Sequence, residues 1–196
     1  DKLKVSLILD EGGVNDASFN QSAWEGALEA KEKYGVEVNY IEAKQESDYA
    51  SNIESAIDQE ADLIIGVGFK LANTIEEAAK LYPEQKFAAI DCAYENIPSN
   101  VQPILFNEEE AGYAAGLVAA NMTKTNKIGF VGGMDIPSVT NFLIGFEKAI
   151  KEENKDIEVL SQYANSFTDT AKGRIIAEQM INDKCDIIFT AGGAVN

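Results

Sequence analysis

The sequence predicts an α/β fold in which parallel sheets are arranged in two lobes. Apolar, β-rich runs alternate along the chain with segments whose apolar residues recur at helical spacing. Several of these runs are almost continuously hydrophobic, as strands covered on both faces require. Strands that alternate with helices form parallel sheets through right-handed crossovers, so both observations indicate the same class of fold.

Eight runs are expected to form strands, and a helical pattern separates most of them. In chain order they are residues 3–10, 36–43, 62–68, 86–93, 101–107, 127–133, 157–164 and 186–193. The first helix is expected to begin at Ser18, because Gln21 three residues later completes a capping box. Gly35 is expected to end that helix in a left-handed cap.

The alternation of strand and helix is interrupted once, over residues 94–107, which join two strands without a helical pattern. A helical segment follows, and a new series of strands begins at Lys127. We therefore expect an N-terminal α/β lobe over residues 1–106 and a second α/β lobe over residues 107–196. The second series holds fewer strands and stops where a helix is due, so we expect a partial lobe in a truncated chain.

Composition narrows the classes of function. The chain carries 33 acidic and 16 basic residues, which gives a formal net charge of -17. This excess of negative charge opposes binding to nucleic acids, which needs clustered Lys and Arg. The absence of histidine removes the commonest general base and metal ligand. Cys92 and Cys185 lie in or beside apolar runs, which is typical of core thiols.

The sequence lacks the motifs of the common catalytic and nucleotide-binding sites. It contains neither G-x-S-x-G nor a P-loop, and Leu71 stands where a dinucleotide fingerprint has its third glycine. We expect no catalysis, no cofactor and no metal requirement. A carboxylate-dependent nucleoside or glycoside hydrolase, using two of Asp10, Asp16 and Asp91, is the enzyme alternative.

Residues at the carboxyl ends of the strands are the candidates for a binding site, because ligands of open parallel sheets bind there. Asp10, Asn15 and Asp16 follow the first strand, and Asp16 fits a turn or helix cap as well as a ligand contact. Asp91 breaks the apolar run FAAIDCA, where a carboxylate needs a backbone, lysine or ligand donor. Glycines at other strand ends are interpreted as turn formers: Gly66, Gly68, Gly132 and Gly133.

Two phenylalanines occupy equivalent places in the two lobes. Phe19 and Phe167 each stand in a polar loop at a strand-to-helix junction. Taken singly, each would pack on its own lobe. Taken together, they would stack on opposite faces of one base, an interaction worth ~1–3 kcal/mol per base. Asp91 would then bond the edge of the ring.

Several segments resemble a known family. DEGGVNDASFNQSAWEG (residues 10–26) closely resembles the signature of the basic membrane protein family, the substrate-binding lipoproteins of nucleoside ABC importers. DLIIGVGFKLANTIEEAAKLYPEQKFAAIDC and SFTDTAKGRIIAEQMI are similar to later segments of that family, in the same order. The resemblance implies a two-lobed, type I periplasmic-binding-protein fold that closes on a purine nucleoside such as inosine, guanosine or adenosine.

The resemblance also implies roles for individual residues. The base would lie between Phe19 and Phe167, with Asp91 bonded to its edge. Asp10 and Gly192 would lie toward the ribose.

Two further motif positions, Asn20 and Trp24, would lie near the pocket. The expected ligand-binding residues are therefore Asp10, Asn15, Asp16, Phe19, Asn20, Trp24, Asp91, Phe167 and Gly192. The family implies an ABC transporter permease as partner. It also implies an extracytoplasmic protein held at the membrane by a lipid on a precursor cysteine, which these 196 residues do not include. A ligand-sensing regulator related to the family is the other alternative.

Overall fold

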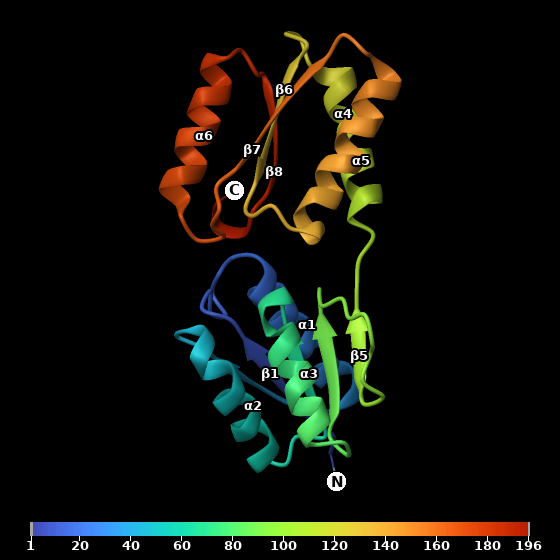
Figure 1. Ribbon diagram of the computed structural model, residues 1–196, viewed down its shortest axis with the longest axis vertical. Helices are drawn as coiled ribbons and strands as arrows, with labels where there is room; N and C mark the ends of the chain where they lie inside the picture. The colour runs from blue at the N-terminus through green and yellow to red at the C-terminus, as the bar shows by residue number, and fades with distance from the viewer. Residues whose placement is uncertain (1, 196) are drawn as a thin grey trace. The chain divides into compact units, whose positions relative to one another are not determined.

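The computed structural model describes residues 2–195, and the chain divides into two compact units between Phe106 and Asn107. Each unit contains a parallel sheet covered by helices and has its own hydrophobic core (Figure 1). The predicted class of fold, α/β with parallel sheets, is confirmed.

The first unit contains a five-stranded parallel sheet with the strand order β2-β1-β3-β4-β5. Its strands are β1 (Lys4–Leu9), β2 (Glu37–Glu42), β3 (Leu63–Val67), β4 (Lys86–Ile90) and β5 (Val101–Ile104). All five lie within the predicted runs. β1 and β3 are neighbours, but the connection after β1 runs to β2 on one side and the connection after β3 runs to β4 on the other side. Such a reversal is the place where open α/β sheets bind ligands.

Helices cover both faces of this sheet. Leu7 of β1 is buried on the face covered by α1 (Phe19–Tyr34). Ile8 is buried on the opposite face, beneath α2 (Tyr49–Asp58) and α3 (Ala72–Leu81) (Figure 1). Successive residues of a strand point to opposite faces, so a nearly continuous apolar strand is what a sheet between two helical layers requires.

The start of α1 differs from the predicted capping box. Ser18 takes the cap position, but its side chain makes no capping hydrogen bond. The carboxylate of Asp16 instead accepts hydrogen bonds from the backbone N–H groups of Ser18 (2.9 Å), Asn20 (2.9 Å) and Gln21 (3.0 Å). One carboxylate can satisfy several orphan N–H groups and also interacts favourably with the helix dipole. At the other end, Gly35 has a φ of 71°, as the predicted left-handed cap requires.

The second unit contains a three-stranded parallel sheet with the strand order β7-β6-β8. The strands are β6 (Lys127–Gly132), β7 (Glu158–Tyr163) and β8 (Ile187–Ala191), again within the predicted runs. β6 is central and pairs with β7 on one side and β8 on the other. The second unit therefore has the same reversal at the end of its first strand.

The helices of the second unit also lie on both faces of its sheet. Phe146 of α5 (Pro137–Glu153) packs with Ile128 of β6. On the other face, Met180 of α6 (Thr170–Asn182) packs with Val131.

Helix α4 (Glu108–Met122) lies against α5 with the two backbones in close contact (Figure 1). A β-carbon at Gly112 of α4 would overlap the backbone of α5, and one at Gly145 of α5 would overlap the backbone of α4. The two helices can approach this closely only because both positions lack a side chain.

Both cysteines are buried and free, as predicted. Burial is the main cause that raises the pKa of the Cys92 thiol, to about 11. Within residues 2–195, none of the helices combines the length and the apolar character that a membrane crossing requires.

Candidate functional site

The candidate site of the first unit lies where β1 ends and the chain turns toward α1. Asp10 follows β1 directly, and its Oδ1 accepts hydrogen bonds from the backbone N–H of Gly12 (3.0 Å) and from Nδ2 of Asn20 (2.7 Å). Asn20 is only 2% exposed, so its amide is a fixed donor. The structure therefore brings Asp10 and Asn20 together and holds the carboxylate in one orientation.

Two other polar residues of the same loop are placed differently. The Asp16 carboxylate is engaged by the N-terminus of α1, so the structure supports its interpretation as a helix cap. Asn15 is exposed in the loop.

Phe19 is the first residue of α1 and lies across the end of β3. Its side chain is 38% exposed. A β-carbon at Gly68, which follows β3 with a φ of 102°, would lie 3.8 Å from Cε1 of Phe19. The ring thus lies at the reversal between β1 and β3, where the sheet geometry places a ligand.

Trp24 packs inside the first unit. Its ring meets the ring of Tyr40 edge to face, with centroids 4.8 Å apart and an interplanar angle of 72°. It also packs against the buried cluster that contains Leu7 and Leu9. These contacts give Trp24 a structural role on the sheet face that α1 covers.

Asp91 follows β4 and adopts a left-handed conformation, with a φ of 58°. Its backbone N–H donates to the carbonyl oxygen of Ile104 (2.9 Å), which continues the ladder between β4 and β5. Asp tolerates this region better than most residues. The left-handed turn explains why β4 ends at Ile90, three residues before the end of the predicted run.

Left-handed backbone marks the candidate loops of both units. Ala17, Asp91 and Asn165 have φ values of 52°, 58° and 53°, and each follows the carboxyl end of a strand. Non-glycine residues in such conformations cost about 1–3 kcal/mol each and concentrate at ligand sites. The remaining non-glycine residues with positive φ follow the helices α2, α4 and α6: Glu60, Asn126 and Lys184.

Glu11 forms the centre of a hydrogen-bonded cluster beside Asp10. Its Oε2 accepts from Nζ of Lys70 (3.0 Å) and from the hydroxyl of Tyr49 (3.0 Å). Burial opposes the negative charge, but hydrogen bonds from its own backbone, Lys70 and Tyr49 outweigh burial and lower the pKa of Glu11. Burial, followed by the bond to Glu11, raises the pKa of Tyr49. The sequence alone did not identify this cluster, because Lys70 and Tyr49 lie 59 and 38 positions from Glu11 along the chain.

The candidate site of the second unit is built around the ring of Phe167. A β-carbon at Gly133 would lie 2.5 Å from both Cδ1 and Cε1 of that ring, so only glycine leaves room for it. The carbonyl of Phe167 accepts from the N–H of Ala194 (3.0 Å). The same β-carbon would lie 3.0 Å from Cα of Gly192, so the structure places Phe167 and Gly192 together at the ends of β7 and β8.

The glycines at the strand ends have several roles, and the prediction that all four form turns is wrong. Gly66 lies within β3, and a β-carbon there would come within 2.9 Å of Ile75. Gly132 is the last residue of β6 and leaves room for the ring of Tyr163. Gly66 and Gly132 exclude a side chain because a neighbouring residue fills the space. Of the four glycines, only Gly68 shows the positive φ of a turn former.

Side-chain hydrogen bonds also order the loop that carries Phe167. Oγ of Ser166 accepts from the N–H groups of Thr168 (3.1 Å) and Asp169 (3.0 Å). Asp169 then caps α6 by accepting from the N–H of Lys172 (3.1 Å). Each unit therefore presents a phenylalanine from a loop with a left-handed residue and an aspartate that caps the following helix.

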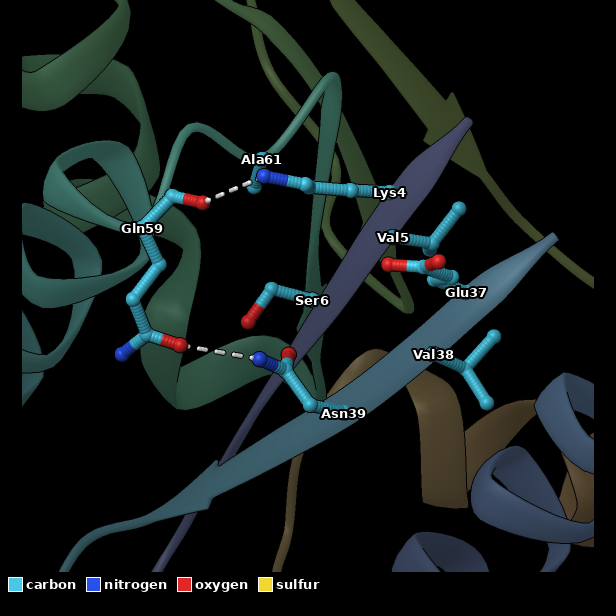
Figure 2. Close-up of a pocket in the computed structure, with 8 residues that line it drawn as sticks. All are labelled: Lys4, Val5, Ser6, Glu37, Val38, Asn39, Gln59 and Ala61. Carbon is cyan, nitrogen blue, oxygen red and sulfur yellow. Dashed lines mark hydrogen bonds between the residues drawn. The ribbon is translucent and has the colours of Figure 1, made fainter. Parts of the chain in front are cut away.

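A hollow of about 260 Å³ lies elsewhere in the first unit, where β1 and β2 begin. Figure 2 shows the side chains of Lys4, Ser6 and Asn39 pointing toward Gln59. Nδ2 of Asn39 donates to Oε1 of Gln59 (3.0 Å). Among residues 2–195, Oγ of Ser6 is buried without a hydrogen-bond partner. Because the amino ends of parallel strands are not where such sheets bind ligands, this hollow is not the candidate site.

The two candidate sites offer aromatic faces and hydrogen-bond acceptors. The first unit presents Phe19 with the pair Asp10 and Asn20, and the second presents Phe167 with Gly192. In the part of the chain that the structure describes, no group of three or more His, Cys, Asp or Glu is placed to hold a metal ion. The arrangement suits the binding of a flat, uncharged ring with polar substituents.

Comparison with known proteins identifies relatives of the chain. The chain is 41% identical to the "ABC transporter nucleoside-binding protein BmpA" of Lactococcus lactis and covers 56% of that protein. It is 40% identical to "Basic membrane protein A" of Borreliella burgdorferi, of which it also covers 56%. The two alignments include 98% and 97% of this chain.

The chain also resembles a solved structure of a transporter solute-binding protein. The chain resembles an ABC transporter solute-binding protein from Aeropyrum pernix with a TM-score of 0.89 and 34% identity. The match covers 98% of this chain and 55% of that one. The chain thus spans about half the length of the relatives that it matches, and its fold is of the type I periplasmic-binding-protein kind.

The family itself is shown by a match over residues 2–196, with the description "ABC transporter substrate-binding protein PnrA-like". The resemblance to the basic membrane proteins is thereby confirmed. This family consists of substrate-binding proteins and not of enzymes, which agrees with the prediction of no catalysis and argues against the hydrolase alternative. The chain belongs to the PnrA-like family of ABC transporter substrate-binding proteins.

Proposed function

We propose that the full-length protein binds a purine nucleoside for an ABC importer, with Phe19 and Phe167 on the two faces of the base. The observation that carries the proposal is the placement of these two rings. Each stands at a strand-to-helix junction beside the reversal of its own sheet. Gly133 leaves space for the ring of Phe167, and Gly68 lies beside the ring of Phe19. A nucleoside-binding relative at 41% identity supports this choice of ligand.

Asp10 is the proposed contact to the ribose. Its Oδ1 is held by Gly12 and Asn20, and no hydrogen bond from the other described residues reaches its Oδ2. An ionised carboxylate accepts hydrogen bonds only, so Oδ2 suits the donating hydroxyls of a sugar. Gly192 would lie on the sugar side from the second unit, where its lack of a side chain allows close approach.

Asp91 is the proposed contact to the edge of the base. An ionised carboxylate requires a donor, and inosine and guanosine present the N–H of N1 whereas adenosine does not. We therefore propose that the protein binds 6-oxopurine nucleosides at least as well as adenosine. Asp16 and Trp24 take supporting positions in this proposal, because Asp16 caps α1 and Trp24 packs on Tyr40. Asn15 is exposed in the loop and stays a proposed ligand contact.

The partner in this proposal is the permease of an ABC importer, and the location is extracytoplasmic, at the membrane surface. The family membership supports both statements, because substrate-binding proteins of importers deliver their ligand to a permease. A lipid on a precursor cysteine would provide the anchor, in line with a relative named as a lipoprotein.

Calorimetric titration of the full-length protein tests the proposal. Inosine, guanosine and adenosine are titrated separately, with uridine and free ribose as controls. We expect saturable binding of the purine nucleosides, with inosine or guanosine no weaker than adenosine. A clear preference for adenosine over both would contradict the role of Asp91. Failure of every purine nucleoside to bind would contradict the proposed function itself.

A further inference from the structure

The cluster formed by Glu11, Lys70 and Tyr49 has no part in the proposed contacts to the nucleoside. Lys70 belongs to a short helical turn, Phe69–Leu71, directly after β3. Its ammonium lies 3.0 Å from Oε2 of Glu11, and the two side chains are 30% and 25% exposed. The pair is therefore partly accessible to a ligand that occupies the end of the sheet.

The two charges lie next to proposed ligand contacts. Glu11 follows Asp10, so their Cα atoms are about 3.8 Å apart. Lys70 comes two residues after Gly68, the position that meets the ring of Phe19. A charged group attached to a ribose bound at Asp10 would come within the range of both side chains.

The hydrogen bonds at Glu11 hold this carboxylate as an anion. Its Oε2 accepts from Lys70 and from the hydroxyl of Tyr49, a residue that is 2% exposed and therefore fixed. The lowered pKa of Glu11 favours the charged form of this carboxylate. Lys70 consequently faces an anion that the protein itself supplies.

We propose that Glu11 determines the charge specificity of the site: by neutralising Lys70, it makes the site accept an uncharged nucleoside and reject the corresponding 5′-phosphate. The inference rests on the proposed nucleoside function. An unpaired lysine is a strong point-charge ligand for phosphate. Paired with Glu11 it loses that ability, and a phosphate would have to displace the carboxylate and then lie beside it.

A purely structural role would give a different result. Partly exposed ion pairs add little stability. If the cluster served only to tie the loop after β1 to α2, a change at Glu11 would alter the melting temperature. It would not alter the ratio of the affinities for a nucleoside and its monophosphate.

The test uses the full-length protein with Glu11→Gln, which retains hydrogen-bonding groups and removes the charge. Inosine and inosine 5′-monophosphate are titrated by calorimetry. We expect the affinity for inosine to stay within about twofold and the affinity for the monophosphate to rise about tenfold. The double variant Glu11→Gln/Lys70→Met should lose that rise. Glu29→Gln, an exposed glutamate of α1, is the matched control for the change in net charge.

Two further variants keep the inference open to refutation if Glu11→Gln does not fold. Tyr49→Phe leaves the ion pair in place, so the affinity ratio should not change. Lys70→Gln leaves Glu11 unpaired, so monophosphate binding should weaken further while inosine binding is retained. An affinity ratio in Glu11→Gln equal to that in Glu29→Gln would overturn the inference while the nucleoside function stands. If the wild-type protein bound no nucleoside, both would fall together.

Discussion

At the scale of single residues, the two phenylalanines of the candidate sites differ from those of the hydrophobic cores. Phe87 is 2% exposed and Phe146 is completely buried, whereas Phe19 is 38% exposed. The ring of Phe167 is bordered by glycines at the ends of β6 and β8. The proposed function assigns both rings to ligand stacking and not to a hydrophobic core.

Replacement of either phenylalanine tests this interpretation. In the full-length protein, Phe19→Ala and Phe167→Ala should each weaken nucleoside binding by about 1–3 kcal/mol, because each removes one stacking surface. The melting temperature without ligand should change little. Phe146→Ala is the opposite control, since deleting a core phenylalanine costs about 3–5 kcal/mol of stability. Strong destabilisation with unchanged affinity in the two site variants would show that these rings serve packing alone.

Several residue roles depend on contacts that the sequence does not reveal. The sequence predicted that Asp91 stands at a strand end, because it breaks an apolar run, and that Phe19 stands at a strand-to-helix junction. The ion pair between Lys70 and Glu11 could not be predicted. The two residues are 59 positions apart in the sequence, and only the order of the strands brings them together. The close contact between Phe167 and Gly133 is likewise a consequence of the tertiary structure.

At the scale of elements, the strands were predictable and the helix cap was not. All eight strands lie inside predicted runs. β1, β3 and β6 show the apolar residues that buried parallel strands need, whereas the edge strands β2 and β7 contain no fully buried residue. Ser18 and Asp16 both precede α1, and which one caps the helix depends on the path of the loop. The left-handed residue Ala17 turns the chain so that the Asp16 carboxylate reaches the helix N-terminus.

This assignment of the cap predicts a contrast between two neighbouring substitutions. Asp16→Ala should lower the free energy of unfolding by about 1–2 kcal/mol, because three backbone N–H groups lose their acceptor. Ser18→Ala should change it by less than about 0.5 kcal/mol, since its side chain makes no capping bond. Chemical denaturation of both variants gives the comparison. A larger loss for Ser18→Ala would restore the capping box.

The contact between α4 and α5 gives a second prediction at this scale. Gly112→Ala and Gly145→Ala should each destabilise the protein by about 1–3 kcal/mol or more, because the added methyl group meets a rigid backbone. Gly26→Ala in α1 is the matched control, with no atom within 4 Å of the new β-carbon. That change should stabilise the protein by up to about 1 kcal/mol through helix propensity. Equal effects at all three positions would show that the α4–α5 backbones are not in close contact.

At the scale of the whole molecule, the net charge affects the binding of charged ligands and of uncharged ligands differently. The net charge of -17 opposes anionic partners in general. It has no direct effect on an uncharged nucleoside. Under the proposed function, local contacts set the selectivity of the site for an uncharged nucleoside, and the negative charge of these 196 residues would add a long-range barrier against phosphorylated ligands.

The difference between uncharged and charged ligands predicts how salt affects their binding to the full-length wild-type protein. Inosine is uncharged, so its affinity should change by less than about twofold between 0.1 M and 1 M NaCl. Inosine 5′-monophosphate should bind more weakly than inosine at 0.1 M. Its affinity should rise at 1 M, because the Debye length falls from about 10 Å to about 3 Å and the repulsion is screened. Competition titrations at both salt concentrations give the two affinities. Tight binding of the monophosphate that weakens with salt, and that is lost in Lys70→Gln, would instead show that Glu11 does not neutralise Lys70.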